Sequence, residues 1–360
     1  MTTAPSASPA AAPPAMTGRA RVLAALRRQP VDATPVWFMR QAGRSLPEYR
    51  ALRERHDFMT LATTPELAAA ATVLPVKRLG VDAAVLFADI MLPLAGMGVR
   101  FEIQPSVGPV ISNPIRTEAD IARLRVPDPE EATPYVFEAL RLLRRDLGEQ
   151  TALLGFAGAP FTLACYLIEG KASREFPRTK ALMYGRPDLW RRLLEVLTET
   201  TIGYLDGQIA AGADAVQLFD SWLGLLGPDA YARHVLPYTR RIFAALPSGA
   251  PAIHFSTGTT SLLDQISIAG CAAVSVDWRL PLDAAWARLG PDLAIQGNLD
   301  PAMLLADWST VQQGALDVMR RAGGRPGHIF NLGHGVLPET DPDHLARLVE
   351  LVHAHESRPT

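Results

Sequence analysis

Two arginines four residues apart, Arg40 and Arg44, directly follow the apolar run of residues 35–39, PVWFM. A guanidinium group stays charged and is costly to desolvate, so a pair beside a buried element indicates an anion that binds between them. Guanidinium forks suit carboxylates or phosphates, and Gly43 allows a tight backbone between the two arginines. The simpler alternative is that both arginines pair with acidic residues at the rim of the fold. We interpret RQAGR as an anion-binding segment.

Other polar or aromatic residues follow the ends of further apolar runs, namely Asp89 in FADI, Tyr166 in FTLACYLIEG, Phe219 and Ser221 in LFDSW, and His334 in NLGHG. Each has a purely structural alternative. Aspartate and serine often cap helices, and a tyrosine in an apolar helix is usually a core residue. A lone histidine is also more often structural than catalytic. We treat these residues as candidate site residues because all of them come at or after the ends of apolar runs.

The elements that must position these residues alternate along the chain. Eight short apolar runs rich in β-branched or aromatic residues predict strands at 35–39, 82–87, 151–156, 213–219, 251–255, 272–276, 292–296 and 327–332. Amphipathic stretches between them predict helices, such as 181–211 and 302–322, and a helical pattern begins at Gly18. Strands that alternate with helices pair in parallel, and eight such units favour a closed barrel.

We therefore predict an α/β fold, a single (β/α)8 TIM barrel with a small insertion after the second strand. The insertion is expected within residues 91–127, where proline, glycine and extended sequence suggest a hairpin. An open doubly wound sheet would show GxGxxG after its first strand, and that motif is absent there. Polar residues after barrel strands face the active site, so the candidates above are expected to converge.

The overall composition restricts the partners. A net charge of -2 gives no general attraction to nucleic acid or anionic lipid, and no apolar run is long enough to span a membrane. The two cysteines, Cys165 and Cys271, fit a reducing cytoplasm. Residues 1–16 lack charge and are rich in proline, alanine, serine and threonine, so we predict a disordered tail there and the barrel domain over residues 17–360.

Several segments resemble the uroporphyrinogen decarboxylase family: PVWFMRQAGRSLPEYR, LFADIM, GFAGAPFTLACYLIEG, LFDSW, VSVDWR, IQGNLDP and FNLGHGVLPETDP. The resemblance runs from about residue 18 to about residue 355. It implies a single (β/α)8 barrel, a homodimer, and a carboxy-lyase of tetrapyrrole biosynthesis that uses no metal or organic cofactor. The implied reaction converts the four acetate side chains of uroporphyrinogen III to methyls and gives coproporphyrinogen III.

The resemblance also implies roles for particular residues. The substrate-binding segment is Arg40, Gln41, Ala42, Gly43 and Arg44, and the remaining binding residues are Asp89, Tyr166, Phe219, Ser221 and His334. Asp89 would accept pyrrole N–H groups and stabilise a cationic intermediate, with Arg40 and Arg44 as its catalytic partners. We expect these arginines to hold the pKa of Asp89 low.

The proton donor is left open among Arg40, Tyr166, and a substrate carboxyl group or water positioned by His334. The sequence departs from the family pattern at Ala88, where serine is often found, and at His254 and Ser256.

Two other functions are weighed against this one. Related barrel methyltransferases bind zinc through a ligand set such as His-x-Cys plus a distant Cys, but the corresponding stretch here is His254-Phe255-Ser256, without the thiol. A non-catalytic tetrapyrrole carrier on the same fold is the second alternative. The presence of both Asp89 and the RQAGR arginines favours the enzyme.

Overall fold

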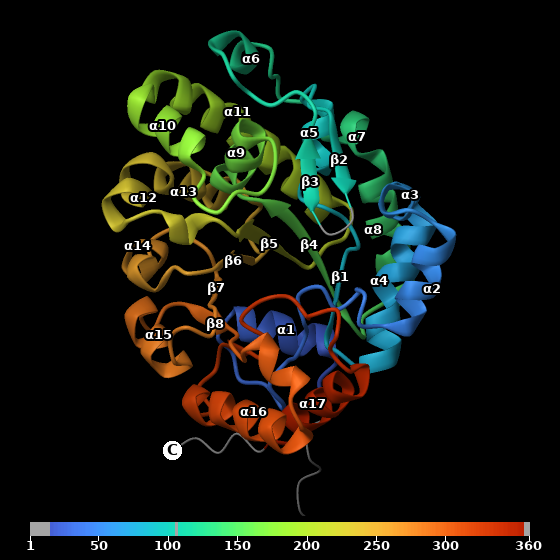
Figure 1. Cartoon of the computed structure of the whole chain (residues 1–360). Helices are drawn as coiled ribbons and strands as arrows, with labels where there is room; N and C mark the ends of the chain where they lie inside the picture. The colour runs from blue at the N-terminus through green and yellow to red at the C-terminus, as the bar shows by residue number, and fades with distance from the viewer. Residues whose placement is uncertain (1–14, 105–106, 356–360) are drawn as a thin grey trace, which may run out of the picture.

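The computed structural model describes residues 15–104 and 107–355 (Figure 1). Most of the tail predicted over residues 1–16 lies outside the described residues, so that prediction remains an expectation. At the edge of the described part, the N–H of Met16 donates to Asp32 at 2.9 Å.

Seven parallel strands form one curled sheet in the order β1-β4-β5-β6-β7-β8-β9. Their bounds are β1 (Ala83–Val85), β4 (Ala152–Gly158), β5 (Ala215–Asp220), β6 (Ala252–Ser256), β7 (Ala273–Ser275), β8 (Ala294–Gln296) and β9 (His328–Ile329). Each strand lies within, or extends one or two residues beyond, one of the runs predicted from the sequence. The succession confirms the predicted (β/α)8 barrel, with one exception at its first strand.

The exception is the predicted strand 35–39, which forms only an isolated parallel bridge between Val36 and Phe330. The segment nevertheless fills the gap between the edge strands β9 and β1. The N–H of Trp37 donates to the carbonyl of Phe330 at 3.4 Å, and the N–H of Asp82 donates to the carbonyl of Val36 at 2.8 Å. Pro35 has no N–H, and side chains accept most of the other backbone donors here, so a regular ladder does not form.

Helices surround the sheet as an outer ring (Figure 1). The α-helices are α1 (Gly18–Leu26), α2 (Pro47–Arg55), α3 (Phe58–Thr63), α4 (Pro65–Leu79), α5 (Leu92–Gly96), α6 (Glu118–Ala122), α7 (Pro129–Ala132), α8 (Pro134–Leu147), α9 (Pro160–Glu169), α10 (Pro177–Gly185), α11 (Pro187–Ala210), α12 (Pro228–His234), α13 (Leu236–Ala245), α14 (Leu263–Ile266), α15 (Leu282–Leu289), α16 (Trp308–Ala322) and α17 (Pro342–Ala354). The short 3-10 helices are η1 (Leu223–Leu225), η2 (Thr260–Leu262) and η3 (Pro301–Leu305).

Two long helices predicted from periodicity are each divided. The stretch 181–211 contains the end of α10 and all of α11, because Pro187 cannot continue the first helix and instead begins the second. The stretch 302–322 contains part of η3 and all of α16. Asp307 caps α16 by accepting the N–H of Thr310 at 2.9 Å, and this cap fixes where the helix begins.

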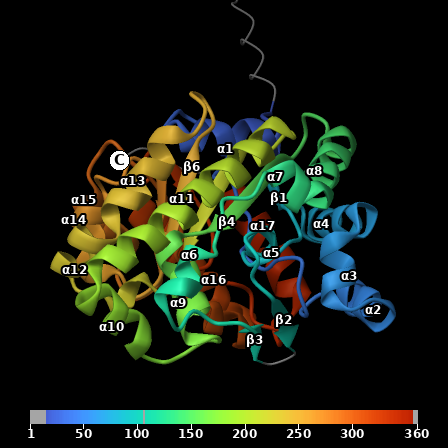
Figure 2. The ribbon, with the colours of Figure 1, turned by 90° about the horizontal axis from the view of Figure 1, so that it is seen from above.

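A separate antiparallel pair, β2 (Phe101–Gln104) and β3 (Gly108–Ile111), lies between β1 and β4 in the chain, within the segment 91–127. Figure 2 shows this pair at one end of the barrel and α1 at the other. The N–H of Arg19 in α1 donates to the carbonyl of Gln150, just before β4, which places α1 at the amino ends of the strands. The β2–β3 pair therefore lies at the carboxyl ends, where a barrel carries its active site.

Candidate active site

A cavity of about 640 Å³ lies at the carboxyl ends of the strands. All ten residues predicted from the sequence line it: Arg40, Gln41, Ala42, Gly43, Arg44, Asp89, Tyr166, Phe219, Ser221 and His334. They come from the segment after residue 39, the loop after β1, helix α9, strand β5 with the residue that follows it, and the loop after β9. The structure thus brings together side chains that are up to about 300 residues apart in the sequence.

The two arginines of RQAGR are exposed at this cavity. Within the described residues, neither Arg40 nor Arg44 has a carboxylate oxygen within 4.0 Å of its guanidinium nitrogens. This observation argues against the simpler alternative of ion pairs at the rim of the fold. Both charges remain available to an anion that enters the cavity.

Arg40 occupies an unusual backbone conformation, with φ at 60° in the left-handed region that non-glycine residues seldom adopt. Two glycines make room for it. A Cβ on Gly43 would lie 2.6 Å from the carbonyl oxygen of Arg40, and a Cβ on Gly335 would lie 2.7 Å from Cγ of Arg40. The glycines in RQAGR and NLGHG therefore let two distant segments pack around one arginine.

A Gly335→Ala substitution is expected to displace the Arg40 side chain and to lower kcat/KM by about tenfold or more, because small misplacements of a binding group are costly. Gly335 does not have a positive φ, so the effect is steric. Steady-state kinetics would measure it. Gly185→Ala is the matched control, since a Cβ there meets no atom within 4 Å. Equal kinetics for both variants would contradict the expectation.

Asp89 follows β1 and is half-buried, and its Oδ1 accepts the N–H of Met91 at 2.9 Å. Burial raises the pKa of Asp89 above its ordinary value, while the Met91 N–H and the charge of Arg40 act in the opposite direction. The expectation that the arginines hold this pKa low is therefore wrong for the substrate-free protein. Among the described residues no guanidinium lies within 4.0 Å of this carboxylate, so desolvation dominates.

The titration of Asp89 provides a direct check. We expect its carboxyl ¹³C resonance, identified by its loss in Asp89→Asn, to titrate with a midpoint above the roughly 3.9 of an ordinary aspartate. Ionisation, and any activity that needs the carboxylate, would then decline as the pH falls through this raised value. An Arg40→Met substitution should raise the midpoint further, because it removes an opposing positive charge. A midpoint at or below the ordinary value would contradict both statements.

His334 and Tyr166 both present neutral hydrogen-bond donors. The Nδ1 atom of His334 accepts the N–H of Gly335 at 2.7 Å, which leaves its proton on Nε2. Burial, followed by the charge of Arg40, lowers the pKa of His334 to about 4. Burial raises the pKa of Tyr166 to about 12. At neutral pH neither side chain is a strong acid, so both are suited to donating hydrogen bonds to substrate oxygens.

Aromatic side chains form an apolar wall of the cavity. Phe219 packs against Phe156 and Phe255 with ring centroids 5.4 Å and 5.3 Å away, and Phe255 packs against His334 at 5.8 Å. All four side chains line the cavity. Edge-to-face rings of this kind suit a ligand with an aromatic or pyrrole surface.

Several lining residues were not found from the sequence. Arg53 and Tyr49 lie four residues apart on α2 and both line the cavity, a helical spacing that could have indicated them. Arg53 adds a third guanidinium to the site. Ile103, Gln104 and Val107, in and beside the β2–β3 hairpin, also line it. No local signal in the sequence indicates that the hairpin folds over the barrel mouth.

Within residues 15–104 and 107–355, no helix combines the length and apolar character needed to cross a bilayer. Within the same residues, no three His, Cys, Asp or Glu side chains lie together as a metal-binding group. His254, weighed above as part of a zinc motif, is buried, packs against Phe243 at 5.6 Å and does not line the cavity.

The family model and the similar sequences agree on one family. The family described as "Uroporphyrinogen decarboxylase (URO-D)" matches residues 17–355. The chain is 52% identical over 343 residues to a uroporphyrinogen decarboxylase of Roseiflexus sp. (strain RS-1), covering 94% of this chain and 99% of that one. It is 55% identical over 352 residues to one of Streptomyces coelicolor, covering 98% and 99%. Among solved structures, a methyltransferase from Methanosarcina mazei has the same fold, with a TM-score of 0.79 at 19% identity over 94% and 98% of the two chains.

Proposed function

Because this chain belongs to the uroporphyrinogen decarboxylase family, we infer that it removes CO2 from the four acetate side chains of uroporphyrinogen in tetrapyrrole biosynthesis. It is a carboxy-lyase. The observation that best supports a catalytic role for the cavity is that its described lining combines one carboxylate with three guanidinium groups and an aromatic wall, and no carboxylate within residues 15–104 and 107–355 pairs with these guanidiniums. We propose uroporphyrinogen III as the substrate and coproporphyrinogen III as the product.

The substrate has four pyrrole N–H donors at its centre and eight carboxylates at its rim. We propose that Asp89 accepts hydrogen bonds from the pyrrole N–H groups, and that Arg40 and Arg44 bind carboxylates. Gln41, Ala42 and Gly43 connect the two arginines along the cavity wall, and Tyr166, Phe219, Ser221 and His334 complete the binding surface. N–H donors favour the ionised carboxylate, so substrate binding should lower the pKa of Asp89 from its raised value.

The chemistry needs a place for the electron pair that departing CO2 leaves behind. Protonation of the adjacent pyrrole carbon gives a cationic ring, which accepts those electrons as the C–C bond breaks. The resulting exocyclic methylene is then protonated to a methyl group, and the ring carbon loses its extra proton. Each cycle therefore replaces one CO2 with one proton and requires no oxidant or reductant.

The cation formed in this sequence is the species that Asp89 would stabilise. Opposite charges about 4 Å apart attract by roughly 4 kcal/mol at an effective dielectric constant near 20. At about 1.4 kcal/mol per decade, that attraction corresponds to at most roughly three orders of magnitude in rate. Only the part that exceeds ground-state binding accelerates the reaction.

Anaerobic turnover tests this function. Incubation of the protein with uroporphyrinogen III should release four equivalents of CO2 and yield a tetrapyrrole with four carboxyl groups, measured by chromatography and mass spectrometry. Tight binding of the tetrapyrrole without product would instead support the non-catalytic carrier.

The assembly and location implied by the resemblance are also proposals. We propose a cytoplasmic homodimer that has no nucleic-acid or membrane partner. Sedimentation velocity at micromolar concentration would detect the dimer, and a single species of 38.9 kDa would contradict it.

A further inference from the structure

We propose that Gln41, Asp82 and Asn331 are positioning residues that hold Arg40 at a fixed place relative to Asp89, by closing the barrel with side-chain hydrogen bonds. The inference rests on the proposed function, because Arg40 and Asp89 are the groups that would act on the substrate. The family resemblance implies that Gln41 binds the substrate. We propose instead that its side chain bonds to the protein and holds Arg40 in place.

The evidence begins with the irregular segment 35–39, which lies between β9 and β1 and leads directly into Arg40. Three of its backbone N–H groups donate to side chains instead of to a neighbouring strand. Val36 donates to Asp82 Oδ2 at 2.7 Å, Phe38 donates to Gln41 Oε1 at 3.0 Å, and Met39 donates to Asn331 Oδ1 at 3.3 Å. The seam of the barrel is thus held by these side chains in addition to backbone hydrogen bonds, such as the one from the N–H of Phe330 to the carbonyl of Pro35 at 2.9 Å.

Gln41 connects this segment to the strand that carries Asp89. Its Oε1 accepts the N–H of Phe38, and its Nε2 donates to the carbonyl of Ala83, the first residue of β1, at 2.9 Å. The side chain is 1% exposed, so water does not compete for these bonds. Since Gln41 is the residue next to Arg40, the same bonds limit how far the Arg40 backbone can move from β1.

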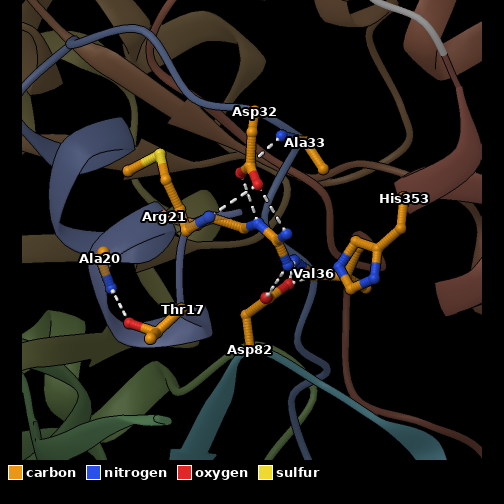
Figure 3. A network of polar contacts seen from close by, with 9 residues as sticks. Thr17, Ala20, Arg21, Asp32, Ala33, Val36, Asp82 and His353 are labelled. Atoms are coloured by element: carbon orange, nitrogen blue, oxygen red, sulfur yellow. Dashed lines mark hydrogen bonds and ion pairs between the residues drawn. The ribbon is translucent and has the colours of Figure 1, made fainter. Parts of the chain in front are cut away.

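Asp82 forms the second connection, at the amino end of β1 (Figure 3). Besides the N–H of Val36, its carboxylate contacts Nη1 of Arg21 in α1 at 3.2 Å and Nε2 of His353 in α17 at 2.7 Å. Asp82 is 3% exposed, and Arg21 is itself held by two contacts to Asp32 at 2.7 Å and 2.9 Å. A buried carboxylate with this many partners fixes the start of β1 against the segment before Arg40.

Asn331 forms the third connection, from the β9 side. It is fully buried, and its Oδ1 accepts the N–H groups of both Met39 and Leu332, the latter at 2.8 Å. Met39 directly precedes Arg40, and His334 follows Asn331 by three residues. The contact therefore links the arginine to the loop that carries another cavity residue.

The conformation of Arg40 explains why such connections are needed. A left-handed arginine is maintained only where its surroundings hold it, and such strain concentrates at functional sites. Here the residues on both sides of Arg40 are held, Met39 through Asn331, and Gln41 through Phe38 and Ala83.

Gln41→Met, which keeps the size of the side chain and removes both hydrogen bonds, tests the proposal. We expect kcat to fall by about 10- to 100-fold, because misplacement of a catalytic group by about 1 Å has effects of this size. We also expect the titration midpoint of the Asp89 carboxyl resonance to rise, because Arg40 moves away. The NMR readout needs no substrate, so it separates this proposal from the proposed reaction.

The matched control is Gln208→Met. Gln208 is also fully buried, and its amide accepts the N–H of Phe156 at 2.8 Å and donates to the carbonyl of Phe156 at 2.9 Å. Loss of the Gln208 hydrogen bonds should lower the melting temperature about as much as Gln41→Met does. It should leave the titration midpoint of Asp89 unchanged. If Gln41→Met changes the midpoint and kcat no more than Gln208→Met does, the proposal is overturned.

A second variant covers the case in which Gln41→Met does not fold. Asn331→Ala removes the acceptor for the Met39 N–H from the opposite side of the seam, and Asn331 itself is not a residue of the cavity lining. It should raise the Asp89 midpoint in the same direction. An unchanged midpoint in a folded Asn331→Ala protein would overturn the proposal on its own.

Discussion

The Asp89→Asn substitution is expected to lower kcat/KM by about 10- to 1000-fold. The upper value corresponds to losing the full electrostatic attraction between the Asp89 carboxylate and the cationic intermediate. Asparagine has the same shape but offers one neutral oxygen and an N–H that opposes the pyrrole N–H groups. The fold should persist, because the described contacts of the Asp89 side chain include only one hydrogen bond, from the N–H of Met91. Steady-state kinetics with uroporphyrinogen III and a thermal melt would measure the two effects.

Asp300→Asn provides the control for this experiment. Asp300 also follows a barrel strand, β8, but its carboxylate caps η3 by accepting the N–H of Ala302 at 2.9 Å and does not line the cavity. Its replacement should leave the kinetics close to those of the unmodified protein. Near-normal kinetics for Asp89→Asn would remove this carboxylate from the mechanism.

The Arg44→Ala substitution is expected to raise KM for uroporphyrinogen III by about 10- to 100-fold, as the loss of a charge-assisted hydrogen bond of roughly 1.5–3 kcal/mol predicts. Arg44 contributes to the cavity lining and has no acidic partner in the part of the chain that the structure describes, so its charge is available to a substrate carboxylate. Arg44→Lys should recover only part of the loss, because an ammonium group lacks the planar fork that binds both carboxylate oxygens.

Arg55→Ala is the control for loss of positive charge on the same part of the chain. Arg55 ends α2, is exposed and does not line the cavity. It should affect KM only slightly, and less as the salt concentration rises. If Arg44→Ala and Arg55→Ala give the same kinetics, Arg44 serves the structure and not the substrate.

The barrel could be predicted from the sequence because its strands are buried on both faces and read as short apolar runs between amphipathic helices. Polar residues just after the strands of a barrel are expected to face the active site. Asp89, Ser221 and His334 follow this rule, since all three line one cavity. Both inferences depend on local patterns that a single sequence contains.

The parts that could not be predicted depend on contacts between distant residues. Residues 35–39 have the composition of a strand, yet Asp82 and Asn331 accept its backbone donors, and the sequence does not show those partners meeting. The pKa of Asp89 rises because burial outweighs the charge of Arg40, a balance set by distances and solvent exposure. The hairpin residues at the cavity mouth were missed for the same reason.

The central claim is that the carboxylate of Asp89 binds the pyrrole N–H groups of a tetrapyrrole whose rim carboxylates meet the arginines. A crystal structure of the protein with coproporphyrinogen III, prepared anaerobically, tests it most directly. We predict Asp89 oxygens about 2.7–3.2 Å from pyrrole nitrogens, with Arg40 or Arg44 on propionate groups. A product bound with Asp89 turned away from the macrocycle centre would contradict the claim.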